Sequence, residues 1–208
     1  MSSIQFIKNW AECLNRHGEL ERLLDKYYKN PAAILQMVSD RKCFVAFNPQ
    51  NKISGFFSFQ ILENKGQIYC YLGLLITAPG KNNIAPQLLN ALKEHLFENF
   101  VAKVKGVIAY GTVSNYRAYQ LVYQTFPSVY PNLEQPNFKP NFYDSVLKNA
   151  DFLTSKAFHY KLTEAPSVAI YQKDFEDKVT NGNIRMQNQL GFDVDLANRE
   201  RLLLMFKM

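Results

Sequence analysis

An uninterrupted apolar run near the middle of the chain dominates its pattern of hydrophobic and polar positions. Residues 68–76 read Ile-Tyr-Cys-Tyr-Leu-Gly-Leu-Leu-Ile. Because this run is too apolar for a strand with one face in water, it predicts a strand that is covered on both faces. The turn-forming segment 77–83 follows, and leucines spaced by three or four residues then predict an amphipathic helix. The residues expected to face the sheet are Leu88, Leu89, Leu92, Leu96 and Phe97.

The flanking segments carry shorter patterns of the same two kinds. Helices are predicted over 8–30, 31–38, 115–126 and 143–155, and strands over 44–47, 53–62, 106–113, 168–171 and 201–206. The first two strands and the central strand follow one another through tight turns, which predicts an antiparallel meander. The central strand, its helix and the strand at 106–113 form a β-α-β unit, whose two strands are parallel.

Length and composition fit one domain. The chain has 208 residues and is 47% hydrophobic, which is enough to fill a core. The elements predict an α+β (α/β) fold over residues 1–208, with a mixed, mostly antiparallel sheet flanked by helices. Residues 127–191 begin rich in proline and aromatic side chains, and we expect them to form an insertion or extension packed on this domain.

The charge and the cysteine content indicate which ligands and which redox compartment to expect. The formal charge of +6 favours anionic ligands mildly, but the positive residues are scattered, which does not indicate nucleic acid. Cys13, Cys43 and Cys70 form no zinc-type pair and no even disulfide framework, so we expect free thiols in a reducing cytoplasm and no metal site. We find no signal peptide and no apolar run of about 18 residues, and therefore expect no membrane span.

Three motifs follow one another along the chain. Residues 53–56 read Ile-Ser-Gly-Phe, residues 72–79 read Leu-Gly-Leu-Leu-Ile-Thr-Ala-Pro, and residues 115–121 read Asn-Tyr-Arg-Ala-Tyr-Gln-Leu. They resemble, in order, the third strand, the fourth strand with its acyl-CoA loop, and the fourth helix of the GNAT superfamily of N-acetyltransferases. The resemblance covers roughly residues 32–126 and the last strand.

Two positions depart from the pattern of that family. Its loop usually reads Arg or Gln, x, x, Gly, x, Gly or Ala, whereas residues 80–85 read Gly-Lys-Asn-Asn-Ile-Ala. Ala85 fits this pattern, but Asn83 stands where a glycine is expected. Asparagine tolerates a positive φ better than most residues, so the turn remains feasible. In the fourth helix the tyrosine of the family falls at Val122, and Tyr123 is the nearest candidate.

The resemblance implies an acyltransferase that moves an acetyl group from acetyl-CoA to a small-molecule or peptide amine. In the family the fourth and fifth strands diverge, here near Ile76, and free backbone groups at Leu74 and Ile76 would bind the amides of the pantetheine arm. Backbone N–H groups from Lys81 to Ala85 would bind the pyrophosphate, and Tyr123 would protonate the leaving thiolate. The implied acyl-CoA-binding residues are Leu74, Leu75, Ile76, Lys81, Asn82, Asn83, Ile84, Ala85 and Asn115.

Each of these assignments has a structural alternative. Lys81 also suits a solvated loop, Asn115 a helix cap, and Tyr123 a packed helix position. At the level of function, the alternative is a GNAT-fold module that binds CoA or regulates a partner without catalysis. The sequence identifies neither the acceptor nor a general base, and a homodimer is compatible with the family.

Overall fold

The computed structural model describes residues 3–81, 83–101, 106–113, 116–135, 138–149, 161–162, 172–173, 188 and 201–208. Within them the sheet has seven strands, in the spatial order β1-β2-β3-β4-β5-β7-β6. The strands are β1 (Ser3–Ile7), β2 (Lys42–Phe47), β3 (Ile53–Asn64), β4 (Gln67–Thr77), β5 (Val107–Val113), β6 (Lys161–Leu162) and β7 (Arg201–Lys207). The helices are α1 (His17–Leu24), α2 (Pro31–Met37), α3 (Ile84–Leu96), α4 (Tyr116–Thr125) and α5 (Tyr143–Asn149).

The strand pairing confirms the predicted topology. Strands β2, β3 and β4 form the antiparallel meander, and β4 and β5 form the parallel pair that α3 connects. Strand β7 pairs antiparallel with β5 on its other side. The fold is therefore the predicted GNAT-like one, a mixed and mostly antiparallel sheet flanked by helices.

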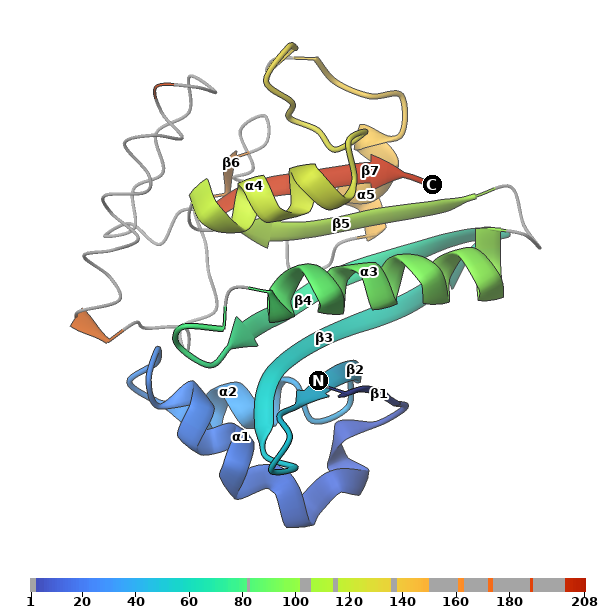
Figure 1. Ribbon diagram of the computed structural model, residues 1–208. Coiled ribbons are helices and arrows are strands. Elements are labelled where there is room, and N and C mark those ends of the chain that lie inside the picture. Colours follow the sequence, from blue (N-terminus) through green and yellow to red (C-terminus); the bar gives the residue numbers. More distant parts are fainter. Residues whose placement is uncertain are drawn as a thin grey trace.

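Helices cover both faces of the sheet, as the central apolar run requires. Helix α3 packs over β2, β3 and β4, and α1 packs against the opposite face of β3 and β4 (Figure 1). In α3, Leu88, Leu89, Leu92 and Leu96 are buried as predicted. The prediction was wrong for Phe97, which is 58% exposed because the α-helix ends at Leu96 and a π-helical turn, Phe97–Val101, follows.

The N-terminal segment differs from its prediction. In place of one helix over 8–30, the chain forms a 3-10 segment, Trp10–Arg16, and then α1, which ends at Leu24. Cys13 has non-helical dihedrals (φ −101°, ψ 38°) and separates two turns of the 3-10 segment. The sequence also did not predict β1. This edge strand buries little of its surface, so its apolar pattern is weak.

The C-terminal third is described only in part. Helix α5 begins at Tyr143 as predicted, and β7 confirms the predicted last strand. The predicted strand at 168–171 lies outside the described residues, as do positions 150–155 of the predicted helix. The extension at 127–191 stays a prediction. Among the described residues, we find no helix with the length and apolar character needed to cross a membrane.

Candidate functional site

Strands β4 and β5 pair along only part of their length. Their register runs from Ile68 opposite Val107 to Leu72 opposite Gly111, whereas β4 continues to Thr77. The wedge between the strands thus opens after Leu72, earlier than the predicted divergence near Ile76. At this apex the strands touch closely, since a Cβ on Gly111 would lie 2.8 Å from both Cβ and the carbonyl oxygen of Leu72.

Pairing with neighbouring strands pulls β4 and β5 apart. The last residues of β5, Thr112 and Val113, stay paired with Leu203 and Leu202 of β7, so β5 follows β7. Strand β4 stays paired with β3, as Figure 1 shows, and the two parallel strands diverge toward their carboxyl ends. The wedge is therefore built by the sheet itself.

A bulge in β4 lies immediately beyond the apex. Leu72 pairs with Phe59 and Leu75 with Phe57, so two residues of β4, Gly73 and Leu74, lie opposite the single residue Ser58 of β3. The Leu74 N–H donates a hydrogen bond to Ser58 Oγ at 2.9 Å. Bulges of this kind bend a strand and increase its twist, which helps β4 to leave β5.

The register decides which backbone groups of β4 face the wedge. The Ala78 N–H donates to the Ser54 carbonyl at 2.8 Å, so Ala78 bonds toward β3. Because bonding alternates along an antiparallel ladder, Ile76 also bonds toward β3, and Leu75 and Thr77 face the wedge. Where Leu74 and Ile76 were expected to face the wedge, this register turns the backbone of Leu75 and Thr77 toward it, and the Thr77 carbonyl there accepts from the Tyr27 hydroxyl.

The carboxyl end of β4 is bonded by Tyr27, a residue that the sequence did not single out. The hydroxyl of Tyr27, just beyond α1, donates to the Thr77 carbonyl at 2.6 Å. Burial raises the pKa of Tyr27, and the positive charge of Arg117 partly offsets that effect.

The loop after β4 delivers the chain to the N-terminus of α3. Its positive φ falls at Gly80 (+74°), whereas Asn83 has φ −85° and ψ −10°. An asparagine at position 83 is therefore unstrained, and the turn needs no glycine there. The N–H groups of Lys81 and Ile84 donate to the carbonyls of Ala78 and Lys81, both at 3.2 Å.

The start of α3 carries no side-chain cap. Asn83 is the N-cap residue, and its side chain accepts no capping hydrogen bond. The N–H of Ala85, in the first turn, has no intrahelical acceptor, and the positive end of the helix dipole lies here. Of the predicted pyrophosphate donors, Ala85 and Asn83 thus fit best. Asn82 lies outside the described residues.

The glycine of the third-strand motif sets the position of this helix start. A Cβ on Gly55 would lie 2.5 Å from Ile84 Cγ2 and 3.1 Å from Leu88 Cδ1. Helix α3 can therefore approach β3 closely only because position 55 has no side chain. This contact holds the loop and the helix N-terminus beside the open end of β4.

Helix α4 places Tyr123 beside the core. Val122, where the tyrosine of the family was expected, is buried, and Tyr123 is half-buried with its ring stacked on Tyr119 at 5.9 Å. The hydroxyl of Tyr119 donates to the Pro131 carbonyl at 3.0 Å, and burial raises its pKa. Asn115 lies outside the described residues, so its predicted role stays a prediction.

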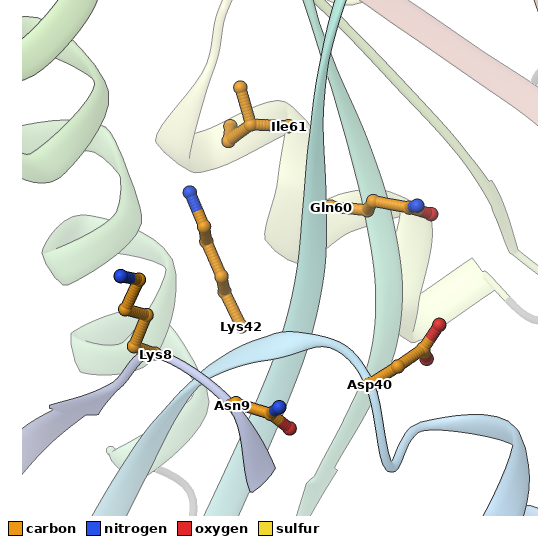
Figure 2. Close-up of a pocket in the computed structure, with 6 residues that line it drawn as sticks. All are labelled: Lys8, Asn9, Asp40, Lys42, Gln60 and Ile61. Carbon is orange, nitrogen blue, oxygen red and sulfur yellow. The ribbon is translucent and has the colours of Figure 1, made fainter.

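A separate cavity of about 340 Å³ lies beside β3, near the residues where β1 ends and β2 begins. Its lining residues are Lys8, Asn9, Asp40, Lys42, Gln60 and Ile61. Figure 2 shows the ends of the Lys8 and Lys42 side chains pointing the same way, away from Asp40 and Gln60. None of the predicted site residues lines this cavity, which is separate from the wedge.

Comparisons with known proteins identify similar structures only. No protein-family model matches the chain, and no curated protein is similar to it in sequence. An aminoglycoside 6′-acetyltransferase type Ii aligns with TM-score 0.48 and 16% identity over 62% of this chain and 87% of its own. YhbS, a GNAT family N-acetyltransferase from Escherichia coli in complex with CoA, aligns with TM-score 0.42 and 13% identity over 57% and 66%.

A third similar structure is a fungal multi-domain β-N-acetylglucosaminidase with a glucosamine N-acetyltransferase region. It aligns with TM-score 0.41 and 19% identity. The alignment covers 52% of this chain and 14% of that longer protein. At TM-scores below 0.5, these three similarities assign neither an activity nor a substrate to this chain.

Proposed function

We propose that this protein is a CoA-dependent acyltransferase that moves an acetyl group from acetyl-CoA to an amine acceptor. The observation that carries the proposal is the divergence of β4 and β5 after Leu72 and Gly111, which leaves one edge of the carboxyl end of β4 without a pairing strand among the described residues. An unpaired strand edge offers alternating N–H and C=O groups to an extended ligand that contains amides, such as a pantetheine arm.

The residues along the wedge match the parts of an acyl-CoA in order. The backbone groups of Leu75 and the N–H of Thr77 would bind the amides of the pantetheine arm. The side chains of Leu74 and Ile76 belong to the apolar cluster on the α1 side of the sheet. The loop from Lys81 through Asn82 and Asn83 to Ile84 and Ala85 would hold the pyrophosphate, with Lys81 as a point charge. Asn115, at the start of the next helical segment, would brace the arm.

The proposed transfer needs few side chains. The amine nitrogen attacks the thioester carbonyl carbon, a C–N bond forms, and the C–S bond breaks. The nitrogen loses one proton to solvent or a base, and the departing thiolate gains one from an acid, for which Tyr123 is the candidate. Positioning the amine against the thioester supplies much of the rate, so a sparse site is compatible with activity.

A direct test separates catalysis from binding alone. Calorimetric titration measures acetyl-CoA affinity, and release of the CoA thiol measures turnover with polyamines, amino acids, aminoglycosides and peptides that have free N-termini. We expect saturable binding and thiol release with at least one acceptor class. Binding without turnover on any acceptor would identify the non-catalytic module instead, and an absence of binding at millimolar acetyl-CoA would refute the wedge as a CoA site.

Two variants test the roles proposed for Lys81 and Tyr123. Lys81→Ala should weaken acetyl-CoA binding by about 3- to 10-fold, more at low salt, while Lys148→Ala on the exposed surface of α5 should not change it. Tyr123→Phe should lower kcat while the affinity for acetyl-CoA is retained. Tyr119→Phe removes a hydroxyl from the same ring stack and controls for lost packing. Unchanged kcat in Tyr123→Phe would exclude Tyr123 as the acid.

A further inference from the structure

A positively charged side chain lies at the point where the wedge opens, and no counter-ion accompanies it within the described part of the chain. Arg41 precedes β2, and its Nη1 atom is buried and has no hydrogen-bond partner among the described residues. No carboxylate of the described residues forms an ion pair with Arg41; the ion pair that the described residues do form joins Arg16 and Glu19. A buried N–H donor without an acceptor carries a desolvation cost that a ligand's acceptor atom would remove.

The surroundings of Arg41 fix its guanidinium over the β4 bulge. A Cβ on Gly73 would lie 2.8 Å from Arg41 Nη1 and 2.5 Å from Ser58 Oγ, so the guanidinium occupies the space that a side chain at position 73 would fill. Its central carbon lies 5.1 Å from the centre of the Tyr71 ring. The charge is thereby held beside Leu72, the last residue of β4 that is paired with β5.

Arg41 and Ser58 lie on the face of the sheet opposite α3. Phe57 and Phe59, which flank Ser58 in β3, belong to the core under α3, and side chains alternate between the faces of a strand. On the Arg41 face, Ser58 is fully buried, and its hydroxyl accepts the hydrogen bond from Leu74. That hydroxyl can still donate a hydrogen bond. Arg41 as a whole residue is only partly buried, although its Nη1 atom is enclosed.

We propose that Arg41, with the hydroxyl of Ser58, binds an anionic group of the acyl acceptor, so that the preferred acceptor is an amine that also carries a carboxylate. The inference rests on the proposed function. A guanidinium presents a fixed fork of N–H donors that matches a carboxylate in two parallel hydrogen bonds. The site lies at the apex of the wedge, so a carboxylate held there places an amine of the same molecule near the thioester.

Tyr71 gives the guanidinium its orientation. Burial raises the pKa of the Tyr71 hydroxyl, and the charge of Arg41 and a hydrogen bond with its side chain partly offset this effect. The ring contact and the hydrogen bond hold Arg41 without neutralising its charge. Asp40, the neighbouring residue in sequence, lines the separate cavity and forms no ion pair with Arg41.

Matched acceptor pairs test the inference. Thiol release is measured with β-alanine against β-alaninamide and with glutamate against glutamine, in the wild type, Arg41→Gln, Arg41→Lys and Arg22→Gln. Arg22 is exposed on α1, and its substitution removes the same charge. We expect the wild type to prefer each carboxylate by its kcat/KM. Arg41→Gln should reduce that preference roughly 10- to 100-fold, Arg41→Lys should retain part of it, and Arg22→Gln should leave it unchanged.

A binding experiment keeps the inference testable if no amine is turned over. Glutarate and glutaramide are titrated against the wild type and Arg41→Gln, with the melting temperature as the readout. We expect a saturable rise with glutarate alone that is lost in Arg41→Gln. Gly73→Ala, which retains the charge but crowds the guanidinium, should lose it as well. Turnover with no preference for carboxylates, or glutarate binding that is unchanged in Arg41→Gln, would overturn the inference and leave the proposed function standing.

Discussion

Replacing Gly55 by alanine tests whether the contact between β3 and α3 sets the position of the acyl-CoA loop. The new Cβ would lie 2.5 Å from Ile84 Cγ2, and an ordinary carbon contact needs about 1 Å more. Ile84 is the first residue of α3 and branches at Cβ, so it cannot turn away freely. We therefore expect the start of the helix to move.

The expected size of the effect follows from two opposing terms. Overpacking a close-packed site costs about 1–3 kcal/mol. Replacing a glycine by alanine restricts the unfolded chain and returns about 0.4–1 kcal/mol. The net loss of about 1–2 kcal/mol should lower the melting temperature by roughly 2–8 °C for a chain of this size. Because the loop moves with the helix, affinity for acetyl-CoA should fall about tenfold or more.

The assay combines chemical unfolding with calorimetric titration of acetyl-CoA. Gly18→Ala provides the matched control, because nothing lies within 4 Å of its added Cβ and Gly18 is part of α1. That control should raise stability by about 0.5 kcal/mol and leave acetyl-CoA affinity unchanged. If Gly55→Ala proved as stable as the wild type and bound acetyl-CoA equally well, the role given to this contact would be refuted.

Two further predictions concern the wedge apex and pH. Gly111→Ala should destabilise the protein by about 2–3 kcal/mol, more than Gly55→Ala, because its Cβ would meet the Leu72 carbonyl at 2.8 Å and backbone cannot rotate away. Thermal unfolding measures this loss, and a smaller loss than in Gly55→Ala would contradict it. Burial and the charge of Lys42 lower the pKa of His95, and Glu98 partly offsets them. A lowered pKa in the folded state means that the unfolded state binds the proton more tightly, so stability should fall as pH drops below about 6.5 and level off below the folded pKa. Urea unfolding between pH 8 and pH 5 measures this loss of stability, which His95→Gln should reduce. If that variant shows the same pH dependence as the wild type, a group other than His95 causes the loss.

The local elements of the fold follow largely from the sequence. The apolar run at 68–76 could only be a covered strand, and the leucine spacing after Ile84 could only be a helix with one buried face. The helix predicted from residue 31 begins at Pro31 in the structure, where the Asn30 side chain accepts from the Ala33 N–H at 3.1 Å. These features depend on neighbours within a few positions, which a linear pattern records. The leucine spacing gave a wrong prediction for Phe97, because helix α3 ends one residue earlier, at Leu96.

The chemistry of the wedge depends on registers that no local pattern contains. Whether Leu74 or Leu75 turns its backbone toward the wedge is decided by one extra residue in β4 opposite Ser58, and a shift of one residue reverses every backbone group beyond it. Arg41 shows the same limit, since it reaches Gly73 only through the pairing of β2, β3 and β4. The sequence by itself determined which segments are strands and helices, because that is set by short-range periodicity. Only the tertiary structure decided which backbone edges stay unpaired and which charge lies beside them, because those properties arise between segments far apart in the chain.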